Sequence, residues 1–363
     1  MADKTLIEWT DATWNPITGC SVVDAGCTNC YAMQLAGTRL KHHPSRAGLT
    51  RVSASRPKWT GEVRLNADWL DQPLRWKRPR RIFVCAHGDL FHPEVPDGWI
   101  DQVFATMAAA PHHIFQVLTK RPERAYAYLT QGWASRVQAI LAPRYLTLHV
   151  LEPLPNVWLG TSISDQESAD ARIPKLLRTP AALRFISAEP LLGRVTLIDR
   201  DPIKLATGVE AQPQHRFYVS LLKGWGAPGY ALPGIDWVIV GGESGPNARP
   251  MHPDWVRTLR DECADAGVPF FFKQWGAWGP AEWKVERQPE EAIERFKARA
   301  EVEGATHAIA PWGSLHEPSH RPWSIERTSC APHAGIRRWG KAGDGRLLDA
   351  QEHSAFPGGQ PCR

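Results

Sequence analysis

The chain has 363 residues, of which 43% are hydrophobic and 22% are charged, and its formal net charge is +5. This balance is typical of a globular protein and excludes a chain that is disordered throughout. No stretch reaches the roughly 20 successive apolar residues that a membrane helix needs, and the N-terminal residues contain no apolar signal core. We therefore expect a cytoplasmic protein that does not associate with a membrane.

Three of the seven cysteines are clustered near the N-terminus, as Cys20, Cys27 and Cys30. In a reducing compartment such a cluster indicates metal ligands or catalytic thiols rather than disulfides. Structural zinc needs a fourth ligand, and the nearest candidates, His42 and His43, follow Cys30 by twelve or more residues. Three cysteines also suit a 4Fe–4S cluster with one open iron, which this spacing favours over zinc. A loop of purely structural cysteines is the third alternative.

The segment 39–81 that follows is strongly basic. It contains twelve Lys or Arg residues and three acidic residues, interleaved with Trp59, Trp69 and Trp76. Cations for phosphates and flat rings for unstacked bases are what a nucleic-acid surface requires. We therefore predict nucleic-acid contacts, with DNA the favoured partner, from Arg78, Arg80 and Arg81. The alternative is a solvated basic face whose Trp rings are packed inward.

From residue 81 onward, apolar runs alternate with helix-length segments. Continuous apolar runs predict buried parallel strands, at residues 81–89, 114–120, 157–162, 183–189, 236–243 and 269–275. Acidic starts and apolar spacing predict helices at residues 97–110, 121–131, 165–178 and 254–266, the last ended by Gly267. With the cysteine segment as a first unit, the pattern predicts an α/β protein, a partial or full (β/α) barrel of about six to seven parallel strands.

Two segments interrupt this pattern. Residues 199–233 are rich in Gly and Pro and read as an insertion between the fifth and sixth units. We expect the barrel to occupy residues 1–283, followed by an extension over 284–363 with one helix at 287–303 and a basic, partly irregular tail.

Polar residues stand at the carboxyl ends of the predicted strands, which share one mouth in a (β/α) barrel. The candidates include Asp89, Lys120, Ser162, Glu189, Glu243, Lys273 and Gln274. Lys120 and Arg121 are candidate phosphate ligands, or else members of surface ion pairs. Lys273 and Gln274 are candidates to contact a base edge, but a buried lysine there is equally suited to pair with Glu189 or Glu243.

Several motifs resemble those of the phage-associated three-cysteine family within the radical SAM superfamily, which is distantly similar to spore photoproduct lyase. The resemblance rests on residues 7–20, 27–32, 89–92, 118–124, 187–192, 241–246, 271–276 and 345–349. The usual superfamily spacing is C-x3-C-x2-C, with an aromatic residue before the last cysteine. This chain has six residues in the first gap and places Tyr31 after Cys30.

The resemblance implies a 4Fe–4S cluster held by Cys20, Cys27 and Cys30, with S-adenosylmethionine bound to the fourth iron. Reduction, by a partner such as a flavodoxin or ferredoxin, would then yield a 5′-deoxyadenosyl radical that abstracts hydrogen. By position, we expect S-adenosylmethionine to be bound by Asp89, Ser162 and Glu189. The expected catalytic residues are Tyr31, Lys120, Glu243, Lys273 and Gln274.

These expectations combine into a radical SAM enzyme that acts on nucleic acid, by repair of DNA photolesions or by base modification. A base must leave its stack to reach such a site, which a basic, aromatic margin favours. Two alternatives remain open: a nucleic-acid-binding protein whose metal loop is only structural, and a radical SAM enzyme that acts on a small molecule or peptide.

Overall fold

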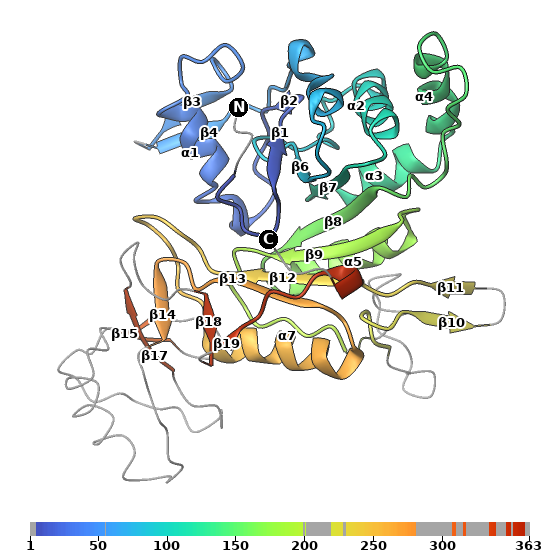
Figure 1. Ribbon diagram of the computed structural model, residues 1–363. Coiled ribbons are helices and arrows are strands. Elements are labelled where there is room, and N and C mark those ends of the chain that lie inside the picture. Colours follow the sequence, from blue (N-terminus) through green and yellow to red (C-terminus); the bar gives the residue numbers. More distant parts are fainter. Residues whose placement is uncertain are drawn as a thin grey trace, which may run out of the picture.

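The computed structural model describes residues 5–54, 56–198, 200, 219–227, 230–280, 307–309, 315–316, 334–338, 346–349 and 351–359. Its centre is a seven-stranded, all-parallel sheet that curls into a half-barrel (Figure 1). The strands in sheet order are β1 (Ala12–Trp14), β6 (Arg81–Val84), β7 (Ile114–Thr119), β8 (Val157–Ile163), β9 (Leu183–Ala188), β12 (Trp237–Gly241) and β13 (Phe270–Gln274). The predicted partial barrel of six to seven strands is confirmed.

Helices connect successive strands, as the alternating pattern predicts. They are α2 (Asp97–Ala109), α3 (Pro122–Leu129), α4 (Trp133–Leu141), α5 (Gln166–Arg178) and α7 (Pro253–Ala266). The Asp165 side chain caps α5 by accepting from Ser168 N, and α7 ends at Gly267, whose φ of 70° is a conformation that glycine adopts without strain. The four predicted helices are therefore confirmed to within a few residues.

Smaller elements flank the half-barrel. After the N-terminal strand the chain forms β2 (Ile17–Thr18), α1 (Tyr31–Gly37), the hairpin of β3 (Thr50–Ser53) and β4 (Arg56–Trp59), and β5 (Arg64–Leu65). Helix α1 packs on this hairpin, where Gly37 lies against the Pro57 ring too closely for any side chain. The remaining strands of the described chain are β10 (Trp225–Ala227), β11 (Tyr230–Leu232), β14 (Trp278–Pro280), β15 (His307–Ile309), β16 (Leu315–His316), β17 (Ala334–Arg338), β18 (Leu347–Leu348) and β19 (Gln351–Glu352).

The predicted insertion does lie between the fifth and sixth strands of the sheet, β9 and β12. Its described part includes the antiparallel β10–β11 hairpin. Most of residues 199–233, and the whole helix predicted at 287–303, lie outside the described residues.

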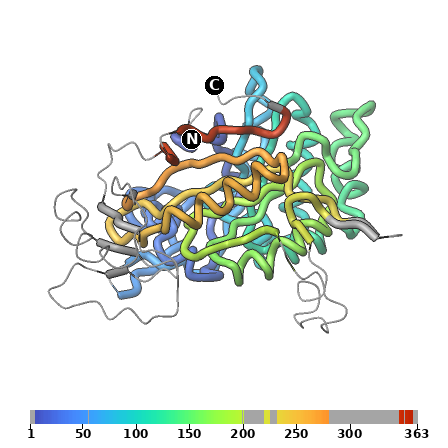
Figure 2. Tube along the Cα trace, turned by 90° about the horizontal axis from the view of Figure 1, so that it is seen from below, coloured from blue at the N-terminus to red at the C-terminus, as the bar shows by residue number. Residues whose placement is uncertain are grey.

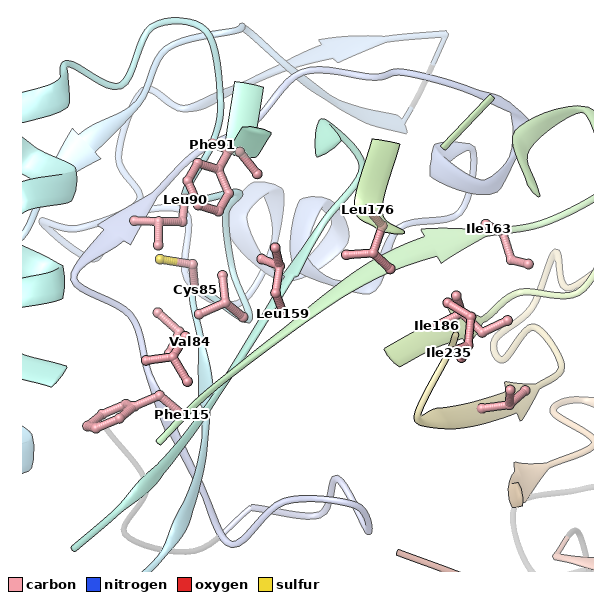
Figure 3. Packing of buried hydrophobic residues seen from close by; sticks show 14 of the residues in the cluster. Val84, Cys85, Leu90, Phe91, Phe115, Leu159, Ile163, Leu176, Ile186 and Ile235 are labelled. Carbon is pink, nitrogen blue, oxygen red and sulfur yellow. The ribbon is translucent and has the colours of Figure 1, made fainter. Parts of the chain in front are cut away.

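The two faces of the sheet carry different cores because successive side chains of a strand point to opposite faces. One face packs against the helices, through residues such as Val84, Phe115, Leu159, Leu176 and Ile186 (Figure 3). The other face carries a separate aromatic cluster, made by Trp9, Phe83, Phe185, Trp237, Phe271 and Phe356. Nearer the carboxyl ends of the strands, polar side chains follow on this same face. Phe185 of β9 is followed two and four residues later by Ser187 and Glu189, and Phe271 of β13 is followed two residues later by Lys273.

Residues 346–349 and 351–359 pack against the barrel, and the second of these segments lies along β13 at the edge of the sheet. Phe272 N donates to His353 O at 2.8 Å, and Ala355 N donates to Phe270 O at 3.2 Å, so this segment runs antiparallel to β13. Figure 2 shows it in red beside the orange β13–α7 region. Residues 351–359 of the predicted extension therefore contribute Phe356 to the aromatic core of the barrel.

Candidate functional site

The three clustered cysteines lie on one loop between β2 and α1, over the carboxyl ends of the parallel strands. A bridge between Gly19 and Gly88 joins the start of this loop to the residues that follow β6. All three thiols are free and half-buried. Burial raises the pKa of Cys20 to about 12, with Asp89 and Cys30 among the groups that add to the rise. Burial also raises the pKa of Cys30, and the neighbouring Cys27 adds to that rise.

Two cations from the end of β7 contact the sulfur atoms. Lys120 Nζ donates to Cys27 Sγ at 3.5 Å, and Arg121 Nη1 donates to Cys20 Sγ at 3.6 Å. Both side chains are largely buried, at 15% and 11% exposure. Positive groups next to sulfur stabilise the thiolate form and any anionic group that thiolates hold. The loop therefore presents thiols in surroundings suited to a metal group.

Asp24 anchors the middle of the cysteine loop. One carboxylate oxygen accepts from Lys120 Nζ at 2.7 Å, and the other accepts from Arg172 of α5. Burial alone would raise the pKa of Asp24, but Lys120 and Arg172 lower it to about 2. Gly26 lies so close to Ser164 Oγ and Lys120 Nζ that a Cβ there would sit 2.2 and 2.8 Å from them. The loop is thus seated tightly on the ends of β7 and β8.

Glu243 anchors the other side of the loop to the end of β12. Its carboxylate accepts from Asn29 Nδ2 at 3.0 Å and from Arg249 Nη2 at 2.6 Å, and Arg249 also donates to Ala25 O. Burial raises the pKa of Glu243, but the hydrogen bonds from Arg249 and Asn29 outweigh it and leave the pKa lowered. This predicted catalytic residue therefore lies at the site, as an anionic support for the cysteine loop.

The residues expected to bind a cofactor have protein partners of their own. Asp89 accepts from Thr119 Oγ1 at 2.7 Å, from Arg121 Nη1 at 2.7 Å and from the backbone N–H groups of Lys120 and Phe91. Ser162 Oγ donates to Glu189 O at 3.3 Å. Asp89 thus holds the arginine that contacts Cys20, and its role in binding a cofactor stays a prediction.

The remaining predicted catalytic residues lie at the same mouth. Lys273 forms an ion pair with Glu189, and Gly241 lies against the Glu189 side chain. The structure therefore shows the ion pair that the sequence offered as the alternative to a contact with a base edge. Gln274 Nε2 donates to Ser244 Oγ at 3.0 Å. The ring of Tyr31 is about half exposed, while its hydroxyl donates to Ala86 O at 2.6 Å. Lys120 and Arg121 are likewise members of ion pairs, with Asp24 and Asp89, although largely buried ones.

The predicted nucleic-acid ligands at 78–81 lie elsewhere. Arg81 begins β6, at the opposite end of the sheet from the cysteine loop, where it pairs with Asp11 and lies over the Phe356 ring. Arg80 lies over the Trp76 ring, and Arg78 is exposed. The Trp side chains of this region mostly point inward, since Trp59 and Trp76 are buried and Trp69 is half-buried. The structure does not bring these arginines into the site.

Sequence reasoning missed four residues that hold the loop: Asp24, Asn29, Arg172 and Arg249. Arg172 could have been found from the sequence, because it shares the apolar face of α5 with Ala169, Ile173 and Leu176 and is buried there. A charge on an apolar helix face requires a partner. The other three stand in loops, and their contacts span long sequence separations that no local pattern reveals.

Comparison with known proteins gives one match. The family model described as "Protein of unknown function (DUF5131)" matches residues 4–357. The chain belongs to this family. No curated protein and no solved structure matches it. The residues of the family match therefore include the cysteine loop and every residue of the site described above.

Two features are absent from the part of the chain that the structure describes. Among its residues, no group of three or more His, Cys, Asp or Glu side chains has the geometry to ligate one metal ion. In a 4Fe–4S cluster, by contrast, each thiolate binds a different iron. None of the helices in the described ranges has the length and apolar character to cross a bilayer.

Proposed function

We propose that this protein is an iron–sulfur enzyme of the radical SAM type that acts on nucleic acid, by repair of DNA photolesions or by base modification. One observation carries the proposal. Three thiols on a single loop lie at the carboxyl mouth of a parallel half-barrel, and largely buried cations donate to two of the sulfur atoms. Active sites of parallel barrels form at this mouth.

The donor set suits the cluster that the sequence implies. Cys20, Cys27 and Cys30 would hold three irons of a 4Fe–4S cluster, and the fourth iron would be open to S-adenosylmethionine. When bound and reduced, this pair supplies a 5′-deoxyadenosyl radical that takes hydrogen from the substrate. Lys120 and Arg121 would offset negative charge at the sulfur ligands, which is the usual role of donors around a metal centre.

The surrounding residues hold the loop in place. Asp24 links it to Lys120 and Arg172, and Glu243 links it to Arg249. Ligands that are fixed before the cofactor binds do not have to be ordered at that moment, which favours a defined geometry for hydrogen abstraction. Glu189 and Lys273 form an ion pair at the same mouth, on the face of the sheet that carries the aromatic cluster.

A basic surface next to the loop supports nucleic acid as the substrate. We call α1 and the β3–β4 hairpin, residues 31–61, the basic lobe. It follows Cys30 directly and contains six Lys or Arg residues and no Asp or Glu. Its exposed cations include Arg39, Lys41, Arg51 and Arg56, and Arg51 lies directly opposite Lys58 in the hairpin. Like charges in that position destabilise a hairpin unless an anion lies over them.

Iron content tests the metal site. Protein purified without oxygen should contain about four iron and four sulfide per chain. Cys20→Ala, Cys27→Ala and Cys30→Ala should each abolish the absorbance of the cluster. Cys85→Ala and Cys263→Ala are matched controls, because both thiols are buried in the core and should leave iron content unchanged. Stoichiometric zinc in place of iron would support the alternative of a purely structural metal loop.

Formation of 5′-deoxyadenosine tests the reaction and its substrate. The reduced, iron-loaded protein should form it slowly from S-adenosylmethionine alone and faster with the true substrate, because substrate binding positions the reacting bond. Ultraviolet-irradiated DNA, undamaged DNA, RNA and a mixture of small metabolites should be compared. Stimulation by metabolites alone would overturn nucleic acid as the substrate. If protein with an intact cluster forms no 5′-deoxyadenosine, the proposal of a radical SAM enzyme is overturned.

A further inference from the structure

Arg46, in the basic lobe, is a buried cation without an acidic partner. Its residue is 4% exposed, and within the described chain its hydrogen bonds are made by Nη1, to Ser45. Its Nε atom is buried and has no hydrogen-bond partner there. The titratable groups that act on it are Tyr31, Cys85 and Arg64, none of them a carboxylate. By contrast, the guanidinium groups of Arg121, Arg172 and Arg249 at the mouth each have an acid beside them.

Such an arrangement is unfavourable for an empty protein. Burial lowers the pKa of Arg46 to about 10, so the guanidinium is still charged near neutral pH. A buried charge without a counter-charge costs several kcal/mol by general estimates, and the unpaired Nε adds to that cost. An anion bound at this point would remove both penalties.

His87 presents a second unpaired group nearby, because Thr18 Oγ1 donates to Ser45 O at 2.7 Å and Gly88 lies against the backbone of Thr18. Its Nδ1 atom is buried and has no partner among the described residues. Burial and the neighbouring Arg46 lower the pKa of His87 to about 4, so the ring is neutral and can donate through one nitrogen. The ring lies edge-on to Tyr31 at 5.8 Å, and Tyr31 immediately follows Cys30. The His87 residue as a whole is partly exposed.

We propose that Arg46 and His87 form a binding site for a phosphate group, which Arg46 holds through its guanidinium and His87 through a ring N–H. Within the proposed function, on which the identity of the ligand rests, this phosphate belongs to the nucleic-acid substrate. The basic lobe favours this source, because its exposed cations belong to the same stretch of chain as the buried Arg46. A phosphate fixed here would place the adjoining nucleotide next to Cys30.

Binding of inorganic phosphate to the full chain tests the site. Titration calorimetry and thermal unfolding should be carried out in chloride buffer, with phosphate, acetate and S-adenosylmethionine as separate ligands. Phosphate should bind the wild type and raise its unfolding temperature. Arg46→Met should lower phosphate affinity by about tenfold or more, because the charge and its planar donors are lost. The same variant should unfold at a higher temperature than the wild type when phosphate is absent, since it removes an unpaired buried charge.

Arg144→Gln is the control, because it removes an exposed cation outside the basic lobe and should keep phosphate affinity within about twofold. If Arg46→Met does not fold, the wild type still decides the matter: phosphate, and not acetate, should shift the ring signals of His87 in the NMR spectrum. The site is overturned if phosphate neither binds nor shifts these signals, if Arg46→Met binds it as well as the wild type, or if acetate or S-adenosylmethionine binds in its place. Iron content and 5′-deoxyadenosine formation are measured separately, so failure of this site is distinct from failure of the proposed enzyme.

Discussion

Asp24 shows how a single carboxylate can fix a loop that bears three thiols. Its two oxygens contact Lys120, which follows β7, and Arg172, which belongs to α5. Since Lys120 also donates to Cys27, the carboxylate keeps that cation in place beside the sulfur. Removal of Asp24 would leave two largely buried cations without their shared partner.

The stability contributed by Asp24 should depend on pH. Its pKa is about 2 in the folded protein against an ordinary value of 3.8, so its contribution is fully present above about pH 4 and is lost as the pH falls through 2. A difference of nearly two units corresponds to about 2 kcal/mol. Asp24→Asn should therefore lower the free energy of unfolding by about this amount at pH 7, with the two proteins converging toward pH 2. Urea unfolding at a series of pH values measures this.

Asp261→Asn serves as the control, because Asp261 is 63% exposed and its ion pair with Arg260 is at the surface. Its effect should stay within about 1 kcal/mol at any pH, as for other surface pairs. A constant difference between Asp24→Asn and the wild type from pH 7 down to pH 2 would contradict the role assigned to the carboxylate.

At the scale of secondary structure, the elements that sequence could predict are those with strong local patterns. The strand residues 183–188 and 237–241 are almost continuously apolar, and Gly267 ends α7 as expected. The candidate site was located because Lys120, Glu189 and Glu243 each follow a strand end. The packing of residues 346–359 against β13 could not be predicted, because the segment is short, lacks a clear period and lies about 80 residues from its partner strand.

Phe356 packs the C-terminal segment against the aromatic core of the barrel. Its ring is 4% exposed and lies 4.8 Å from the ring of Trp237 and 5.5 Å from that of Phe271. Phe356→Ala should lower the free energy of unfolding by about 3 kcal/mol, whereas Phe356→Leu should cost about 1 kcal/mol, because it keeps most of the buried volume. Urea unfolding followed by Trp fluorescence measures both. An equal, small effect of the two variants would show that the segment contributes little.

At the scale of the whole molecule, the charges form two separate basic regions at opposite ends of the sheet. The basic lobe lies beside the cysteine loop, since α1 begins directly after Cys30, and Figure 1 shows α1, β3 and β4 together. Arg78, Arg80 and Arg81 lie at the amino end of β6. In the sequence both regions fall within the single basic segment 39–81. The direction of the strands separates them in space, and composition does not reveal that direction.

Salt dependence should distinguish these two regions. Replacement of Arg39, Lys41, Arg51 and Arg56 by Gln should weaken DNA binding and reduce the slope of log K against log salt concentration by up to about 3 to 4, because fewer counterions are released. Arg78→Gln with Arg80→Gln is the matched control and should leave the slope nearly unchanged. Fluorescence anisotropy with a labelled oligonucleotide, at several salt concentrations, measures both. Equal slopes in the fourfold variant and the wild type would remove the basic lobe as the contact surface.

The closure of the sheet edge by residues 346–359 also bears on biosynthesis. Every strand of the half-barrel is translated before this segment, so a nascent chain that has reached β13 still carries an unpaired strand edge next to Trp237 and Phe271. Edges of this kind pair with other chains. A ribosome that stops short of residue 346 would thus release a chain inclined to aggregate. Synthesis of residues 351–359 is therefore the step that covers this strand edge and protects the chain from self-association.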